Sequence, residues 1–217
     1  RGTLNACSPC CATASNSKPR GKPEKADMGI AGILQPRDPR AAKAQVQRAL
    51  AAQHHWGPAR PVTWSSEIGE HALALGHGNS GTLAARGSRF IGVVDGEIHN
   101  LDELTGSLPP DANDLALCNG AWSVAMVDIT DGTLLLARDH LGIKPLYLYP
   151  TDHGLIFATE IKAILAVADR RLAVNPTVVA RFLDQTLIDA GEETFFAGIR
   201  ALPAGHCCLL YTSPSPR

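Results

Sequence analysis

The chain has 217 residues, of which 45% are hydrophobic, so it can bury one substantial core. Its 20 lysine and arginine residues nearly balance 21 acidic ones, which leaves no broad field to attract nucleic acid or an anionic membrane. No apolar run approaches the roughly 20 residues that span a bilayer, and the N-terminus lacks the order of a signal peptide. These properties predict a cytoplasmic protein that works on small molecules or with another domain, without nucleic acid or membrane.

Both ends of the chain differ in composition from its body. Residues 1–27 have few large apolar side chains, which predicts a disordered leader, or upstream sequence translated ahead of a start at Met28. The cysteines within residues 7–11 have no second Cys or His pair nearby to complete four zinc ligands, so we predict no metal site. Residues 208–217 resemble the translation of a transposase sequencing adapter, and we predict that they are an artefact and that the natural chain continues.

The body of the chain begins with a strand and a helix. Residues 29–34 are short, apolar and glycine-bearing, as in a buried strand. Asp38 then caps a helix that has Pro39 at its first position and runs to about Gln53. Short apolar runs separated by Gly, Asp and Pro predict six strands, at 71–75, 90–94, 122–129, 133–137, 146–149 and 155–158.

A turn and two more helices complete the pattern. Asp131-Gly132 predicts a hairpin turn between two of the strands. Residues 160–167 predict a helix, and Asn175 with Pro176 caps another. Because strands cluster in the middle and helices lie toward the ends, the order favours an α+β sandwich over a parallel doubly wound sheet.

The glycine-rich residues 76–81, GHGNSG, fit the G-x-G-x-x-G pattern of dinucleotide-binding sites. That pattern needs a helix directly after it, because the phosphate binds at the helix N-terminus. Only TLAA separates the glycines from Arg86-Gly87, which is too short for the helix. We therefore predict a glycine-rich strand end or loop here, and no cofactor in this fragment.

Two long stretches, ARDHLGIKP at 137–145 and FATEIKA at 157–163, resemble the N-terminal glutamine amidotransferase domain of asparagine synthetases. Weaker matches follow the order of that family at 29–34, 54–58, 95–100 and 198–206. The resemblance implies a four-layer αββα sandwich of two antiparallel sheets, the N-terminal-nucleophile amidotransferase fold. It also implies that the amidotransferase-like domain occupies 28–172, and that 173–207 holds its end and a linker to a synthetase domain.

The same resemblance implies a mechanism whose central residue is missing here. Family members use an N-terminal cysteine to attack the glutamine amide, with its own α-amino group as base. In this chain either Met28 stands in the cysteine position or the cysteine is deleted before Gly29. A thioether supplies no thiolate, so we predict no catalytic residue.

The substrate contacts of the family are also altered. Asp95, Gly96 and Glu97 match its NGE segment, in which Asn and Gly build the oxyanion hole and Glu holds the substrate amino group. An aspartate there would repel a developing oxyanion unless it were protonated. The family arginine that clamps the substrate carboxylate falls near Asn79 and is absent, whereas Asp114 matches an aspartate that grips the amino group. Glutamine binding is therefore doubtful.

The strongest motif is interpreted structurally. We predict turn and ion-pair contacts for its polar residues and packing for its apolar ones: Arg138, Asp139 and Lys144 in the first group, and Leu141, Ile143 and Tyr147 in the second. Relative to the family, about one helix is missing between Asp114 and Asn119.

Three functions stay open at this point. The first is the amidotransferase-like part of an asparagine-synthetase-type ligase that has lost glutaminase activity, as in relatives that close β-lactams or lasso peptides with an internal amine. ATP and magnesium would then bind in the synthetase domain. The alternatives are an active glutamine-hydrolysing asparagine synthetase with a mis-sequenced start, and a non-enzymatic domain that binds a partner ligase or an amino acid. The sequence also leaves a homodimer open.

Overall fold

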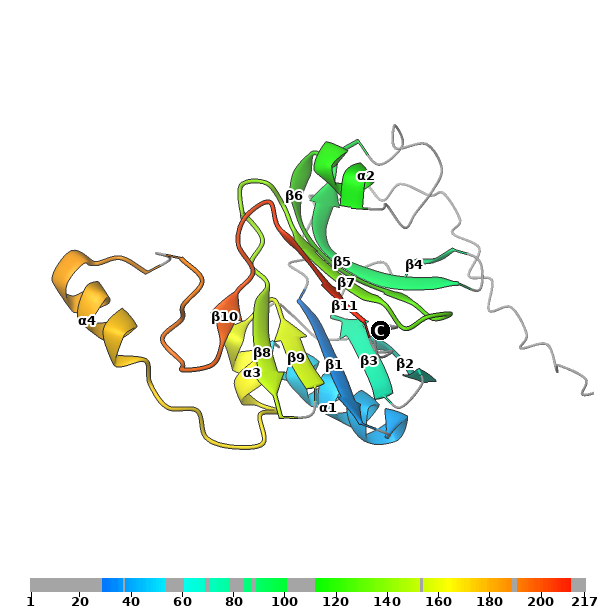
Figure 1. Cartoon of the computed structure of the whole chain (residues 1–217), viewed down its shortest axis with the longest axis horizontal. Coiled ribbons are helices and arrows are strands. Elements are labelled where there is room, and N and C mark those ends of the chain that lie inside the picture. The colour runs from blue at the N-terminus through cyan, green and yellow to red at the C-terminus, as the bar shows by residue number, and fades with distance from the viewer. Residues whose placement is uncertain are drawn as a thin grey trace, which may run out of the picture.

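In the computed structural model, two antiparallel β-sheets pack face to face and helices cover their outer faces (Figure 1). The described residues are 29–36, 38–53, 61–68, 71–78, 84–86, 89–100, 112–152, 154–188 and 191–211. Among these, no helix is long and apolar enough to cross a membrane.

The larger sheet has six strands in the order β10-β8-β9-β1-β3-β2. Their bounds are Ile30–Pro36 for β1, Val62–Ile68 for β2, His71–His77 for β3, Tyr147–Thr151 for β8, Gly154–Ala158 for β9 and Arg200–Ala201 for β10. Strand β1 is central, because Ile33 lies opposite Ala74 of β3 on one side and Ile156 of β9 on the other. The N-terminal end of β1 is therefore enclosed by neighbouring strands.

The smaller sheet has five strands in the order β11-β7-β6-β5-β4. Their bounds are Ala84–Arg86 for β4, Phe90–Ile98 for β5, Gly120–Asp128 for β6, Leu134–Arg138 for β7 and Cys207–Leu210 for β11. The predicted hairpin turn joins β6 to β7, where Gly132 has a φ of 76° and the Asp131 carboxylate accepts from Thr133 N at 2.8 Å. The turn chemistry read from the sequence is confirmed.

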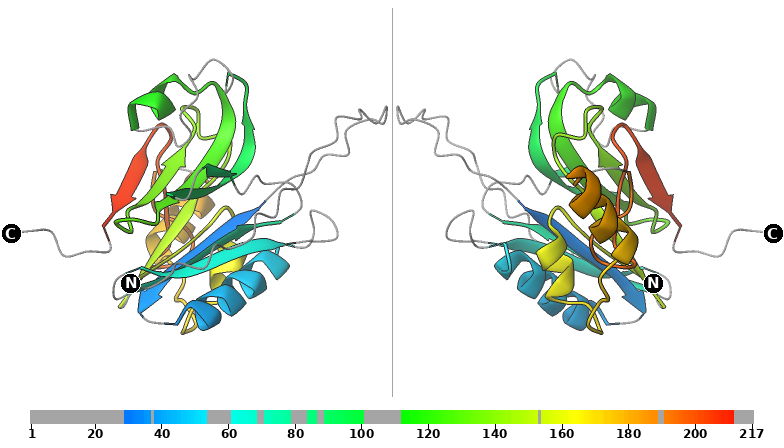
Figure 2. Two further views of the ribbon diagram at one scale, coloured as in Figure 1. Left: turned by 90° about the vertical axis from the view of Figure 1, so that its right-hand side faces the viewer. Right: turned by 90° about the vertical axis from the view of Figure 1, so that its left-hand side faces the viewer.

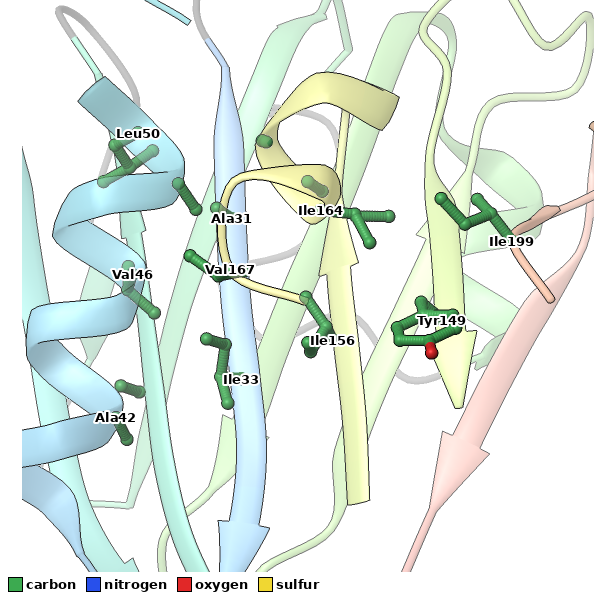
Figure 3. Close-up of a cluster of buried hydrophobic side chains, with 14 of the residues drawn as sticks. Ala31, Ile33, Ala42, Val46, Leu50, Tyr149, Ile156, Ile164, Val167 and Ile199 are labelled. Atoms are coloured by element: carbon green, nitrogen blue, oxygen red, sulfur yellow. The ribbon is translucent and has the colours of Figure 1, made fainter. Parts of the chain in front are cut away.

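Helices α1 (Pro39–Ala51) and α3 (Ile161–Leu165) cover the outer face of the larger sheet. The Asp38 side chain accepts from the backbone of Arg40 and Ala41 at 2.9 and 3.0 Å, so the predicted helix cap is confirmed. Figure 3 shows side chains of α1 packing toward β1, with Val46 among them. Each fully buried aliphatic side chain of this size stabilises the fold by roughly 1.5–3 kcal/mol.

The space between the sheets is filled by alternate residues of facing strands. Leu73, Val93 and Leu136 belong to this inner cluster, and a Cβ at Gly32 would overlap the Phe157 ring. On the opposite face of the smaller sheet, α2 (Ala112–Leu117) packs through Leu115. The layers therefore run helix, sheet, sheet, helix, and the predicted αββα sandwich is confirmed.

Helix α4 (Pro176–Gln185) stands apart from the sandwich in Figure 1, and in both views of Figure 2, which look along the direction of its projection, it overlaps the strands. Its predicted cap is confirmed, because Asn175 Oδ1 accepts from Thr177 N at 3.1 Å. Beyond it, Ile199 and Leu202 return to the buried clusters on the larger sheet and between the sheets. The segment 173–207 thus contributes core residues as well as a projecting helix.

All six strands predicted from apolar runs are present, as β3 and β5 to β9. Strands β2, β4, β10 and β11 were not predicted, because they are polar, short or at sheet edges. Strand β11 includes part of the predicted adapter sequence, and pairs with β7 through backbone groups that any side chain permits. The pairing of β11 does not test whether residues 208–217 derive from an adapter, so that assignment stays a prediction. The predicted leader, residues 1–27, lies outside the described residues.

Candidate functional site

The N-terminal end of β1, where the resemblance puts the nucleophile, is tied down by its neighbours. Ile30 N donates to Thr159 Oγ1 at 3.1 Å, and Thr159 N donates to Ile30 O at 3.1 Å. Gly78 N donates to Gly29 O at 3.0 Å. The backbone from Gly29 onward is therefore fixed, while Met28 lies outside the described residues.

The end of a buried glutamine side chain lies beside Gly29. Gln53 is 5% exposed and its Nε2 donates to Ile30 O at 3.4 Å. A Cβ added to Gly29 would overlap Gln53 Oε1, which has no hydrogen-bond partner among the described residues. A side chain at Gly29 would therefore require the end of the Gln53 side chain to move.

The end of β3 brings His77 opposite Ile30. His77 is buried, and its Nδ1 donates to Gly78 O at 3.0 Å, because a carbonyl oxygen can only accept. Burial lowers the pKa of His77 from 6.5, although the bond to Gly78 opposes this shift. The imidazole is therefore neutral near pH 7. Asn79, the position of the missing arginine, lies outside the described residues.

Three predicted site residues lie together on β5. Asp95 is 3% exposed and Glu97 is exposed to solvent. Gly96 has a φ of 100°, and a Cβ there would overlap the carbonyl oxygen of Ala121 on β6. Only glycine satisfies both constraints at this position of the paired strand.

The Asp95 carboxylate is paired with a cation from the strongest motif. Lys144 Nζ lies 3.2 Å from Asp95 Oδ1, and the two side chains are 23% and 5% exposed. The predicted ion-pair contact of Lys144 is therefore confirmed. The Lys144 ammonium group therefore provides a buried carboxylate with an opposite charge, which offsets part of the cost of burying it.

The 138–145 loop is held rigid by its own polar residues. The buried Asp139 carboxylate accepts four backbone N–H groups at 2.9–3.3 Å, those of Trp122, Leu141, Ile143 and Lys144. Arg138 donates to three backbone carbonyls at 2.6–2.8 Å, those of Gly142, Lys144 and Leu202. The predicted turn contacts of Arg138 and Asp139 are confirmed, and they position Lys144 for its ion pair.

The apolar residues of this loop behave differently from the prediction. Leu141 is 80% and Ile143 59% exposed, so the prediction that they pack is wrong. The carboxylate of Asp139 draws their backbone N–H groups inward, which leaves their side chains facing solvent. Tyr147 does pack, against the outer cluster of the larger sheet.

The fourth predicted contact, Asp114, lies on α2 over the outer face of the smaller sheet. Its side chain lies outside the described part of the chain, so its role stays a prediction. Sequence reasoning missed Gln53 altogether. It follows Val46 and Leu50 at helical spacing, and a polar residue on that apolar face was the available signal.

Comparison with solved structures defines the class of fold. The chain is similar to glutamine phosphoribosylpyrophosphate amidotransferase from Bacillus subtilis, with a TM-score of 0.51 and 15% identity over 64% of this chain and 43% of that one. This likeness shows the fold, which is the αββα sandwich of the N-terminal-nucleophile amidotransferases.

Sequence comparison narrows the assignment. Residues 110–214 match the model of the glutamine amidotransferase domain. The chain is 41% identical over 51 residues to the putative asparagine synthetase [glutamine-hydrolyzing] 2 of Methanocaldococcus jannaschii, covering 24% of this chain and 10% of the relative. It is 34% identical over 91 residues to asparagine synthetase [glutamine-hydrolyzing] 2 of Bacillus subtilis, covering 40% and 12%.

The chain is therefore similar to glutamine amidotransferase domains over residues 110–214 and, over shorter stretches, to asparagine synthetases. The matched parts amount to about a tenth of the length of these two relatives.

Proposed function

We propose that this domain is the N-terminal part of an ATP-dependent ligase of the asparagine synthetase type and that it no longer hydrolyses glutamine. The main evidence is the ion pair between Asp95 and Lys144. It occupies the position where the resemblance places an oxyanion-hole amide. An ionised carboxylate offers only acceptors, and an acceptor cannot stabilise developing negative charge.

The ion pair also removes the remaining route to an active oxyanion hole. A protonated Asp95 could donate a hydrogen bond, but Lys144 at 3.2 Å favours the ionised form. The ammonium group in turn is directed at Asp95, so the pair carries no net charge toward a substrate. Loss of one such donor costs about 100-fold to 1,000-fold in rate.

The start of β1 supports the same conclusion. The sequence places Met28 before Gly29, and a thiol on Gly29 itself would require the Gln53 side chain to move. With both nucleophile and oxyanion donor altered, ammonia would not be released here. The parent ligase, acting in the cytoplasm, would then use an amine already present in its substrate, with ATP and magnesium bound in its synthetase domain.

Glutamate release tests the loss of glutaminase activity. The purified chain is incubated with glutamine, with a glutamine-hydrolysing asparagine synthetase as the positive control. We expect no glutamate above the rate without protein. Turnover that a thiol reagent abolishes would show that a cysteine acts as nucleophile and would refute the proposal.

The ligase assignment has a separate test. Reading the gene beyond codon 207 is expected to reveal the SGG-type pyrophosphate-binding loop of a synthetase domain. A stop codon in the genomic sequence soon after codon 206 would exclude the ligase and favour a stand-alone binding domain. Calorimetry with glutamine would then separate an amino-acid-binding domain from a scaffold.

A further inference from the structure

A small pocket lies on the smaller sheet between α2, the end of β7 and the turn at 204–207. Its volume is about 80 Å³, and its apolar wall includes Leu115 and Ala137. Its polar wall is made by Trp122, Arg138, His140 and His206. None of the residues above belongs to the β5 site, so the pocket is independent of the glutaminase question.

The indole of Trp122 is an unused hydrogen-bond donor. Trp122 is 2% exposed, and its Nε1 has no hydrogen-bond partner among the described residues. Burial of a donor without an acceptor is unfavourable, and because Trp122 lines the pocket, a group bound there could supply the acceptor. The backbone of Trp122 is held in place, because its O accepts from Asp139 N at 2.9 Å and its N donates to the Asp139 carboxylate at 3.3 Å.

The pocket favours a negatively charged acceptor. Arg138 donates to three uncharged backbone carbonyls and pairs with no carboxylate in the described part of the chain. His206 Nδ1 donates to Ala204 O at 2.8 Å, which leaves Nε2 available. Among the side chains that the structure describes, no acidic one lines the pocket, and the Asp139 carboxylate nearby is directed at backbone N–H groups.

We propose that this pocket binds a carboxylate group, either that of a small free acid or that of an aspartate or glutamate side chain from another protein segment. A planar carboxylate has two acceptor oxygens, which suits one fixed indole donor beside a guanidinium. The volume of about 80 Å³ admits a group of this size and excludes a nucleotide or a whole phosphorylated metabolite.

The indole N–H resonances of the ¹⁵N-labelled full chain give a direct test. The chain has three tryptophans, and Trp122→Phe identifies the resonance of interest. Titration with acetate is expected to shift that resonance in a saturable manner and to leave that of Trp64 unchanged. Glutamate blocked at both main-chain groups has only its side-chain carboxylate free. Tighter binding of blocked glutamate than of acetate would favour a protein side chain as the source of the carboxylate, and weaker binding would favour a small free acid.

Surface variants test which residues bind the carboxylate. His140→Ala and His206→Ala change exposed residues, and we expect each to weaken acetate binding about threefold or more. His99→Ala, which changes an exposed histidine outside the pocket, is the matched control and should have no effect. The proposal is wrong if the Trp122 resonance does not move, if chloride shifts it equally, or if both pocket variants bind acetate like the parent.

Discussion

Replacement of Asp139 by asparagine is expected to destabilise the whole sandwich, because its carboxylate binds the chain's own backbone. Asp139 Oδ1 accepts from Leu141 and Ile143, and Oδ2 accepts from Trp122 and Lys144. In Asp139→Asn one oxygen becomes an NH₂ group, so two buried N–H donors face another donor. Each unsatisfied donor costs about 1–3 kcal/mol, which predicts a loss of about 2–6 kcal/mol.

This loss is measurable by urea denaturation. With a dependence of about 2 kcal/mol per molar urea, the midpoint should fall by about 1–3 M. Asp131→Asn is the matched control, because Asp131 is exposed and accepts from one backbone N–H in a hairpin turn. We expect the control to lose less than about 1 kcal/mol. If Asp139→Asn unfolds at the midpoint of the control, the carboxylate is not what holds the 138–145 loop.

Three further changes probe the β5 site and the end of β3. Gly96→Ala should lower the free energy of unfolding by about 2–4 kcal/mol, because the added Cβ overlaps a carbonyl oxygen. The control is Gly191→Ala, which has a similar φ of 102° but no atom within 4 Å of the added Cβ, and it should cost only about 1–2 kcal/mol. Similar thermal shifts of the two variants would contradict the steric overlap. Lys144→Met should cost about 2–4 kcal/mol because it removes the ammonium group beside the buried Asp95 carboxylate. Adding Asp95→Asn should recover at least about 1 kcal/mol in a double-mutant cycle, and strict additivity would refute the coupling. The folded-state pKa of His77 lies below 6.5, so its contribution to stability is complete above pH 6.5 and is lost as the pH falls below that value. His77→Gln should therefore flatten the dependence of the free energy of unfolding on pH between about pH 7 and 5. An unchanged slope would contradict the lowered pKa.

Local signals in the sequence predict the elements that local chemistry decides. Asp38-Pro39 and Asn175-Pro176 start helices because a side-chain oxygen two residues upstream binds free N–H groups, whatever the rest of the fold does. Asp131-Gly132 makes its turn for similar reasons. By contrast, β2 has mixed polarity at a sheet edge, and its strand conformation comes from pairing with β3.

The candidate site depends on contacts between distant segments, which local patterns do not encode. Lys144 reaches Asp95 across 49 positions of sequence, so the motif predicted an ion pair without its partner. The prediction that Leu141 and Ile143 pack was wrong because it used only their hydrophobicity. Hydrophobicity does not show which way the backbone turns, and here the bonds to Asp139 orient both side chains toward solvent. Gln53 was missed since its burial is imposed by the start of β1.

The hydrogen bonds of Arg138 and Asp139 show how family likeness could persist whether or not a domain hydrolyses glutamine. Both side chains form hydrogen bonds with the chain's own backbone, and none of these bonds involves a residue that was predicted to bind glutamine. A descendant that abandons glutamine still needs them to fold, so selection for foldability preserves the signature after selection for the reaction has ended. Genes found by this signature are therefore expected to encode both active glutaminases and domains that have lost the activity. The residues at the position before Gly29 and at position 95 should distinguish the two groups.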